Sequence, residues 1–204
     1  MKFTGERPTL ENKDEIMVSR IRYHSILPFC INRSIMDLGC GIGHGSFYLS
    51  DYTDKQVTGY DISEEAIHEA KQLFIKTNLS FKVINNLEDL NFEEVDLLTM
   101  VEFIEHLEKP EADKFFERLS SIEHLSIALT TPNGDQFSYH PTSPEQYHGY
   151  HRWHYTFYEL LDLKKYFKFI KVYADVFDPV LKKFTSYVVF ASNTVDPIYF
   201  INNQ

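Results

Sequence analysis

The stretch that decides the fold runs from residue 34 to residue 43 and reads SIMDLGCGIG. Its first half, Ser34 to Leu38, is a short apolar run typical of a buried parallel strand. Its second half contains alternating glycines, which let a backbone turn tightly and approach a ligand closely. The segment from Gly43 to Asp51 then predicts a helix, whose first N–H groups would face the same ligand. The stretch therefore predicts a strand, a ligand-binding turn and a helix in direct succession.

The same succession of strand and helix continues along the chain. Ser63 is a favourable N-cap for a second helix, and Pro110 suits the first turn of a third. Further strands are predicted at 56–60, 81–84, 95–100 and 126–131, followed by two β-rich runs at 169–176 and 184–191. This order predicts an α/β fold with a doubly wound, mostly parallel seven-stranded sheet of Rossmann-like type and an antiparallel C-terminal strand pair.

We expect one domain over residues 1–204, with an N-terminal helical extension at 1–30. Residues 134–154 are polar, rich in His, Tyr and Pro, and longer than ordinary connections, so we expect a substrate-side loop there. Aromatic residues of this region could wall an acceptor pocket or form a small core of their own, namely Tyr147, Tyr150, Trp153 and Tyr155. Thr156 and Glu159 have the spacing of a capping box that opens a helix through Phe167.

The composition limits the class of partner. The chain has 204 residues, 43% of them hydrophobic, and a net charge of −10. An acidic surface repels phosphate-rich partners, so nucleic acid is disfavoured. No run approaches the roughly 18–20 apolar residues of a membrane span and no signal peptide is evident, so we expect a cytoplasmic protein with no membrane partner. Cys30 and Cys40 are expected to be free, buried thiols, and the oligomeric state is left open.

Two common types of glycine loop do not fit this sequence. A dinucleotide-binding loop would place a third glycine at position 44, where His44 stands, and a P-loop would need Gly-Lys-Ser/Thr. What remains is Asp37 followed by Gly39, Gly41 and Gly43. This pattern resembles motif I of the class I S-adenosylmethionine (SAM) methyltransferases. The resemblance implies SAM as the cofactor, with the glycines beneath it and Asp37 at its aminoacyl part.

The resemblance extends to the end of the second predicted strand. In this family an acid there takes the two ribose hydroxyls, and Asp61 stands at that place. A carboxylate suits this task because it can accept hydrogen bonds from both neighbouring hydroxyls. At the adenine position, where the family often has an acid, Asn86 offers an amide oxygen to the adenine amino group. The remaining residues that we expect to bind the cofactor are Ile62, Leu87 and Glu102.

The segment after the fourth predicted strand, residues 102–107, reads EFIEHL. It resembles a methyltransferase subgroup with a Glu-x-x-Glu-His-Leu string facing the methyl group of the cofactor. Other shared features are Gly5-Glu6-Arg7-Pro8, Thr131-Pro132-Asn133, and His151 ahead of Tyr155-Thr156. By analogy this subgroup implies a hydroxyl, or an amine, of a small molecule or sugar as the methyl acceptor. His106 and His151 are candidate bases because imidazole titrates near working pH, and Glu105 is a third candidate catalytic residue.

Two alternatives remain open. Small-RNA 2′-O-methyltransferases use a Glu-x-x-Glu-His string and a distant histidine to bind a divalent metal at the RNA 3′ end. Glu102, Glu105 and His106 fit that string, and the fourth ligand could be His140, His148, His151 or His154. The favoured hypothesis assigns no metal, and the net charge of −10 argues against RNA. The second alternative is a non-catalytic SAM-binding module, against which the intact glycines and Asp61 argue.

Overall fold

The computed structural model describes residues 13–136, 151–178 and 183–197. Its strands follow the order β3-β2-β1-β4-β5-β7-β6 of a seven-stranded sheet, which confirms the predicted doubly wound α/β class. The chain divides into two compact units, a first unit of residues 1–101 and a second unit of residues 102–204. The predicted single-domain organisation over 1–204 stays a prediction.

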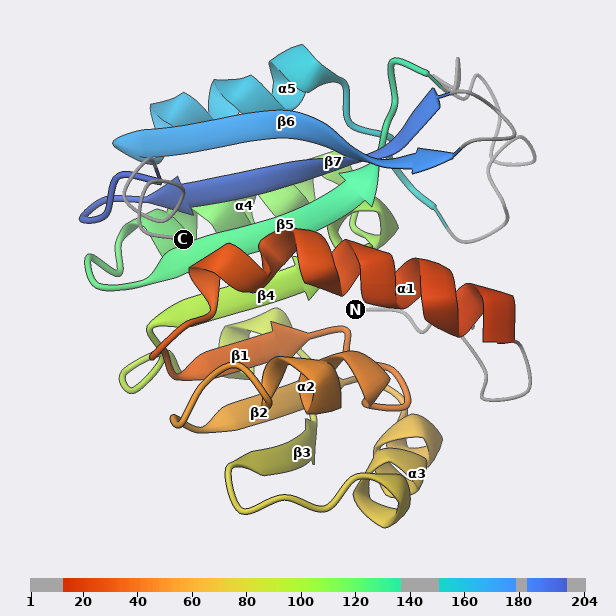
Figure 1. The fold of residues 1–204 in the computed structure, drawn as a ribbon. Helices are drawn as coiled ribbons and strands as arrows, with labels where there is room; N and C mark the ends of the chain where they lie inside the picture. The colour runs from red at the N-terminus through yellow and green to blue at the C-terminus, as the bar shows by residue number, and fades with distance from the viewer. Residues whose placement is uncertain (1–12, 137–150, 179–182, 198–204) are drawn as a thin grey trace. The chain divides into compact units, whose positions relative to one another are not determined.

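The first unit holds four parallel strands and the helices between them (Figure 1). Strand β1 pairs with β2 and β4, and β2 pairs with β3, in every case parallel. The elements are α1 (Lys13–Ile26), the 3₁₀ turn η1 (Leu27–Phe29), β1 (Ile35–Leu38), α2 (His44–Leu49), β2 (Val57–Asp61), α3 (Glu64–Leu73), β3 (Leu79–Val83), the 3₁₀ turn η2 (Leu87–Asp89) and β4 (Leu97–Val101).

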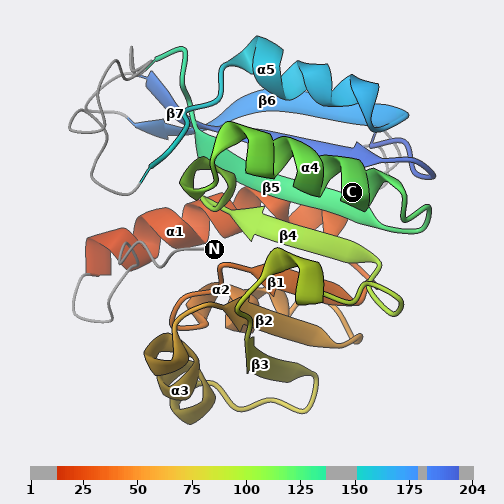
Figure 2. The same cartoon turned by 180° about the vertical axis from the view of Figure 1, so that it is seen from behind.

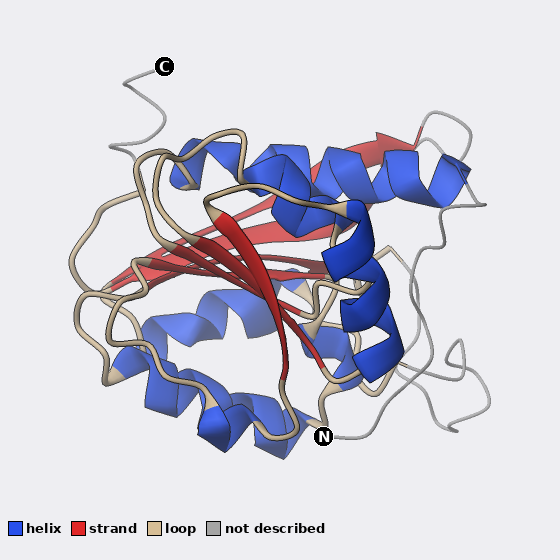
Figure 3. Cartoon of the chain, turned by 90° about the horizontal axis from the view of Figure 1, so that it is seen from below, coloured by secondary structure: helices blue, strands red, loops and turns tan. Residues whose placement is uncertain are grey.

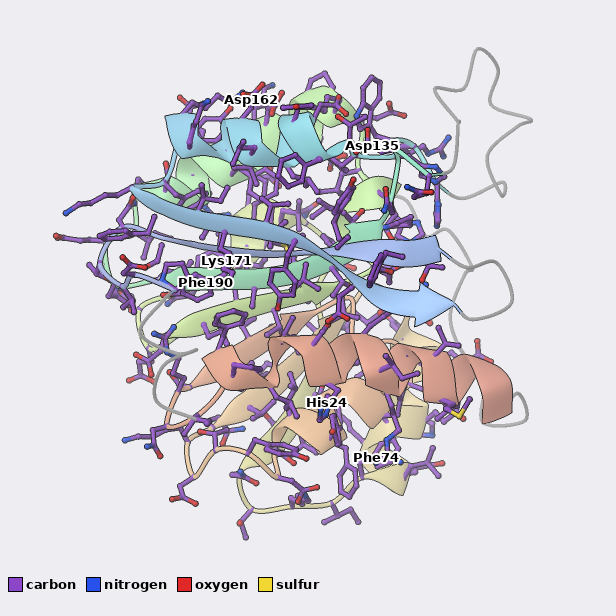
Figure 4. The ribbon with its side chains drawn as sticks, turned by 45° about the horizontal axis from the view of Figure 1, so that its top comes forward. His24, Phe74, Asp135, Asp162, Lys171 and Phe190 are labelled. Atoms are coloured by element: carbon purple, nitrogen blue, oxygen red, sulfur yellow. The ribbon has the colours of Figure 1, made fainter. Side chains whose placement is uncertain are left out.

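Helices α1 and α2 lie on the same face of the first unit's strands (Figures 1 and 2). Their close approach depends on Gly45, because a methyl group at that position would come within 1.9 Å of the Tyr23 ring. Tyr23 is accordingly buried. His24 on α1, labelled in Figure 4, adds a polar contact between its Nδ1 and the Tyr48 hydroxyl at 3.0 Å. Helix α1 falls within the N-terminal extension expected at 1–30.

Helix α3 forms for the local reasons that the sequence indicated. Ser63 is its N-cap, and the Ser63 hydroxyl accepts a hydrogen bond from the Ala66 N–H at 3.2 Å. Acidic residues in its first turn face the positive end of the helix dipole. Its buried face, which includes Ile67 and Ala70, packs against Cys40 and Phe81 beneath the glycine loop. Cys30 and Cys40 are both buried and free, as predicted.

The second unit holds three antiparallel neighbours in the order β5-β7-β6. The predicted antiparallel C-terminal pair, β6 and β7, is confirmed. Strand β7, the last in the chain, lies between β5 and β6. Lys171 on β6 is paired with Phe190 on β7 (Figure 4). The elements are the 3₁₀ turn η3 (Ile104–His106), α4 (Lys109–Ser120), β5 (Ser126–Pro132), α5 (Phe157–Leu161), the 3₁₀ turn η5 (Asp162–Lys165), β6 (Phe169–Asp178) and β7 (Lys183–Ser192).

Helices α4 and α5 lie on the same face of the second unit's strands (Figure 2). Thr156 and Glu159 form the predicted capping box at the start of α5. The helix expected to run through Phe167 ends instead at Leu161 and tightens into a 3₁₀ turn, as helix ends often do. The strands have the usual twist of β-sheets (Figure 3). Among the described residues, no helix has the length and apolar character needed to cross a membrane.

Candidate functional site

The acid at the head of the glycine loop is buried within the first unit. Asp37 has no exposed surface, and its carboxylate accepts hydrogen bonds from three hydroxyl groups. These come from Tyr23 on α1 at 3.1 Å, Ser46 on α2 at 2.6 Å and Thr99 on β4 at 2.8 Å. Burial raises the pKa of Asp37, and the three hydroxyl donors oppose that rise. Asp37 therefore joins α1, α2 and β4 beneath the loop.

The glycine loop has a backbone that favours glycine at each alternate position. Gly39, Gly41 and Gly43 have φ values of 79°, 54° and 85°, in the left-handed region. Gly43 is also closely packed, since a methyl group there would lie 2.6 Å from the Phe81 ring. A side chain at 43 would thus meet both backbone strain and a buried ring.

Asp61 holds this loop from the end of β2. Its Oδ2 accepts the Gly41 N–H and its Oδ1 accepts the Ser63 N–H, both at 2.9 Å. Each carboxylate oxygen has a second lone pair. The partly exposed Asp61 can therefore support the loop and still accept from a diol.

The residues expected near adenine differ in exposure. Leu87 is buried, Ile62 is half-buried and Asn86 is exposed. The Asn86 Nδ2 donates to Asp89 Oδ2 at 3.1 Å, which directs the amide nitrogen toward Asp89. The Asn86 oxygen is the atom that an adenine amino group would need as an acceptor.

His44 contributes a feature that the sequence patterns did not assign. It begins α2, its Nε2 lies 2.9 Å from the Ser19 hydroxyl on α1, and its ring meets the edge of Tyr23. Burial, together with the positive charge of Arg20, lowers the pKa of His44 to about 4. The histidine at this place is therefore neutral at pH 7.

In the second unit, the segment that begins at Glu102 has a strained start. Glu102 has φ = 51°, which is uncommon for a residue with a side chain. Its Oε1 accepts the Thr130 hydroxyl at 2.8 Å, and its N–H donates to the Thr130 carbonyl at 3.0 Å. Such strain persists where surrounding contacts hold it, which is common at functional sites.

Glu105 connects this segment to residues far along the chain. Its side chain is fully buried, and its Oε2 accepts the Thr131 hydroxyl at 3.0 Å. Its main-chain carbonyl accepts two N–H groups, from Arg152 at 2.6 Å and from Trp153 at 3.1 Å. These main-chain bonds place residue 151 beside η3.

The three residues predicted as catalytic come together here. Glu105, His106 and His151 each offer one ligand atom, and the three atoms all lie within 4.8 Å of one another. The rings of His106 and His151 are 5.0 Å apart and nearly perpendicular. His151 Nδ1 in turn lies 2.7 Å from Nε2 of the buried His154. His140, His148, Tyr147 and Tyr150 lie outside the described residues.

The donor set of this cluster fits a divalent metal ion. A carboxylate and two imidazoles suit ions such as Mn²⁺ or Zn²⁺. Metal ligands are usually held by a further hydrogen bond, and here Thr131 supports Glu105 while His154 contacts His151. The same groups could equally act as an acid and base pair.

The aromatic residues near the cluster, Tyr155 and Trp153, differ in burial and in hydrogen bonding. Tyr155 is buried, and burial raises the pKa of its hydroxyl well above the ordinary value, so it belongs to the core of this segment. Trp153 is half-buried, and its indole N–H donates to Glu159 at 3.0 Å. Asp135, labelled in Figure 4, anchors the start of α5 by accepting the Phe157 N–H at 2.7 Å.

Residues 35–122 match a family model described as "Methyltransferase domain". This matched part, which is less than half of the 204 residues, is similar to a methyltransferase domain. The matched residues include the glycine loop, Asp61, Glu102 and the Glu105–His106 pair, while His151 lies beyond them. The chain shares its fold with magnesium protoporphyrin IX methyltransferase from Synechocystis PCC 6803, which was solved with bound S-adenosylhomocysteine (TM-score 0.61, 16% identity, 92% of this chain and 89% of that chain).

Three other comparisons show the range of similar methyltransferases. Methyltransferase phqN of Penicillium fellutanum is 27% identical over 99 residues, 47% of this chain and 30% of that protein. The small RNA 2′-O-methyltransferase of Arabidopsis thaliana is 32% identical over 113 residues, 49% of this chain and 12% of that protein. The chain thus spans less than a third of either curated relative. The methyltransferase domain of bacterial CtHen1-C shares the fold with a TM-score of 0.64 and 21% identity, covering 87% of this chain and 100% of that chain.

Proposed function

We propose that this protein transfers the methyl group of SAM to a hydroxyl oxygen of a small molecule or sugar. The observation that carries the proposal is the cluster of Glu105, His106 and His151, with ligand atoms within 4.8 Å of one another. A hydroxyl is a weak nucleophile until its proton is removed, and a pair of imidazoles beside a carboxylate suits that task. An amine that is already unprotonated can attack with its own lone pair, so it has less need of such a cluster.

The cofactor-binding residues are proposed from the first unit. Asp61 would take the ribose hydroxyls and Asn86 the adenine amino group, with Gly39 and Gly41 presenting backbone to the cofactor. Asp37, Gly43, Ile62 and Leu87 are proposed to complete this set, and Glu102, which begins the second unit, is proposed as a further cofactor-binding residue. Asp37 would act chiefly through the loop, because its carboxylate is buried and already accepts three hydroxyl donors.

When bound, SAM would supply an electrophilic methyl group, which passes to the acceptor oxygen as the C–S bond breaks and its electron pair stays on sulfur. The chain's own residues would orient the acceptor oxygen and receive its proton on His106 or His151. The nearby Glu105 carboxylate would stabilise the imidazolium that forms. Positioning supplies much of the acceleration in a displacement of this kind.

A second candidate is a metal-dependent small-RNA 2′-O-methyltransferase. The specific observation in its favour is that Glu105, His106 and His151 have a donor set and spacing that fit a divalent ion. The similarity to the Arabidopsis thaliana small RNA 2′-O-methyltransferase supports the same alternative. The net charge of −10 disfavours an RNA acceptor, so we place this candidate second.

Two measurements test the proposed function. Calorimetric titration of SAM should show binding, and its absence at millimolar SAM would overturn the cofactor assignment. Formation of S-adenosylhomocysteine is then measured with sugars, small hydroxyl compounds, amines and short RNA 3′ ends, each with Mn²⁺, Mg²⁺ or EDTA. The proposal expects turnover with a hydroxyl compound or sugar. Turnover only with RNA and only with metal supports the second candidate, whereas SAM binding without turnover supports a non-catalytic module.

Variants test the cluster separately. At least one of His106→Ala and His151→Ala should lower turnover by about 10²–10⁴-fold, the usual contribution of a general base, while leaving the Kd for SAM unchanged. The matched control is His68→Ala, since His68 is exposed on α3 in the first unit. Full turnover in both cluster variants would overturn the assignment of the base.

A further inference from the structure

The segment that directly follows His151 is held at both ends. The Glu105 carbonyl accepts the N–H groups of Arg152 and Trp153, directly after His151. Beyond them, Thr156 and Glu159 form the capping box of α5. A side chain between two such anchors keeps a defined position, and both residues of this interval, His154 and Tyr155, are buried.

The contact between the two histidines is short and specific. His151 Nδ1 and His154 Nε2 are 2.7 Å apart, and their ring centroids are 4.9 Å apart at an angle of 69°. A neutral imidazole has one N–H and one lone pair, on different nitrogens. The hydrogen bond therefore has two directions, and each direction assigns a different tautomer to His151.

Only one direction leaves His151 able to act at its other nitrogen. If His151 Nδ1 donates to His154, then Nε2 of His151 carries the lone pair that a base or a metal ligand requires. If His154 donates instead, Nε2 of His151 is protonated and can do neither. Groups that hydrogen-bond the outer nitrogen of a catalytic or metal-binding histidine commonly set its tautomer in this way.

We propose that His154 is a positioning residue that accepts the Nδ1–H of His151 and thereby presents the Nε2 lone pair of His151 to the Glu105–His106 cluster. The use of that lone pair rests on the proposed function. The hydrogen bond and the tautomer do not, so the two can fail separately. His154 acts through His151 and is not itself assigned to contact the acceptor.

The tautomer can be read directly by NMR on protein labelled with ¹⁵N-histidine, at one mildly alkaline pH. The signals of His151 are identified by their loss in His151→Gln. We expect Nδ1 of His151 to be protonated and Nε2 to be unprotonated in the wild-type chain. The opposite tautomer in the wild-type chain overturns the proposal, whatever the variants do.

Two substitutions of His154 then separate positioning from packing. His154→Phe fills the space without an acceptor and should shift His151 toward the Nε2–H form. His154→Gln offers an amide oxygen near the former Nε2 and should keep the wild-type tautomer. An unchanged tautomer in His154→Phe overturns the proposal. Should His154→Phe fail to fold, the wild-type tautomer and the His154→Gln variant still decide it.

Turnover gives the second readout. His154→Phe should lower kcat by about 10–100-fold, as loss of a supporting hydrogen bond commonly does, and His154→Gln should restore most of it. The Kd for SAM should stay unchanged in both variants, as in the control His68→Phe. Equal kcat in all His154 variants overturns the positioning role. Absence of turnover in the wild-type chain, together with the expected tautomer, would overturn the proposed function alone.

Discussion

His44 shows how one residue's surroundings set its charge in this protein. The ring lies at the start of α2, beside Ser19 and the edge of Tyr23, where burial disfavours the imidazolium. The positive charge of Arg20 adds to that effect, and the pKa of His44 falls to about 4. Asp37 illustrates the opposite case, because burial raises its pKa while hydroxyl donors retain part of its acidity.

The neutral His44 predicts a loss of stability in acid. The unfolded chain binds a proton at this residue below pH 6.5, whereas the folded chain binds it only near pH 4. The free energy of unfolding should therefore fall by about 3 kcal/mol between pH 7 and pH 4 because of His44, since each pKa unit is worth about 1.4 kcal/mol.

Urea denaturation of the wild-type chain and of His44→Gln across this range measures the effect. As the pH falls, the wild-type chain should lose more unfolding free energy than His44→Gln, because the variant lacks the buried imidazole. Curves that stay parallel from pH 7 to pH 4 would contradict the assigned burial of His44.

Among the elements, α1 is attached to the first unit in part through a buried tyrosine. The Tyr23 hydroxyl donates to the Asp37 carboxylate, and its ring covers Gly45. Tyr23→Phe keeps the ring and removes one donor, while Ser46 and Thr99 still serve the carboxylate. We expect the free energy of unfolding to fall by about 1.5–3 kcal/mol, the range for hydrogen bonds to a charged group.

Hydrogen exchange gives the local measurement for α1. Amide protection within Lys13–Ile26 should fall in Tyr23→Phe more than protection in β1. The control is Ile21→Ala on the same helix, where the side chain is 45% exposed and substitution should cost less than about 0.5 kcal/mol. Equal effects of the two substitutions would show that the hydroxyl contributes nothing to the attachment of α1.

Helix α5 depends on its cap in a comparable way. The Thr156 hydroxyl accepts the Glu159 N–H at 3.3 Å, and the Glu159 carboxylate accepts the Thr156 N–H at 2.9 Å. Thr156→Ala should lower the free energy of unfolding by about 1 kcal/mol, and Thr156→Ser should recover most of this loss. Thermal denaturation measures both, and a serine variant as unstable as the alanine variant would contradict the cap's role.

Elements of this kind could be predicted because their signals are local. The caps at Ser63 and Thr156, the strand runs and the glycine loop each depend on neighbouring residues, and the structure contains them all. The insertion of β7 between β5 and β6 could not be inferred locally, since it depends on pairing between distant segments.

The candidate site likewise has a part that could be predicted from local sequence and a part that could not. Its residue types were predicted from the glycine loop and the Glu-x-x-Glu-His string. Their supports were not, because Thr99 reaches Asp37 across 62 residues, and the Glu105 carbonyl meets the N–H groups of Arg152 and Trp153 through the tertiary fold. No periodicity or spacing in the chain encodes such long-range hydrogen bonds.

At the scale of the whole molecule, the net charge of −10 disfavours an RNA acceptor. The class of acceptor in turn determines how turnover depends on salt. A neutral acceptor gains nothing from counterion release, so kcat/KM should change less than about twofold between 50 and 200 mM salt. An RNA acceptor held by several phosphate contacts would lose about 10³-fold or more in affinity over that range. Initial rates at graded salt, with ionic strength as the single variable, therefore distinguish the two classes of acceptor.

Trp153 has an optical consequence for the whole chain. It is the single tryptophan of the sequence, it belongs to the second unit, and its indole N–H is bonded to Glu159. Indole emission therefore reports on residues 102–204 alone, whereas circular dichroism follows the helices of both units. Denaturation curves recorded by the two signals will coincide only if both units unfold in one cooperative transition. Two different midpoints would instead give a separate stability for each unit.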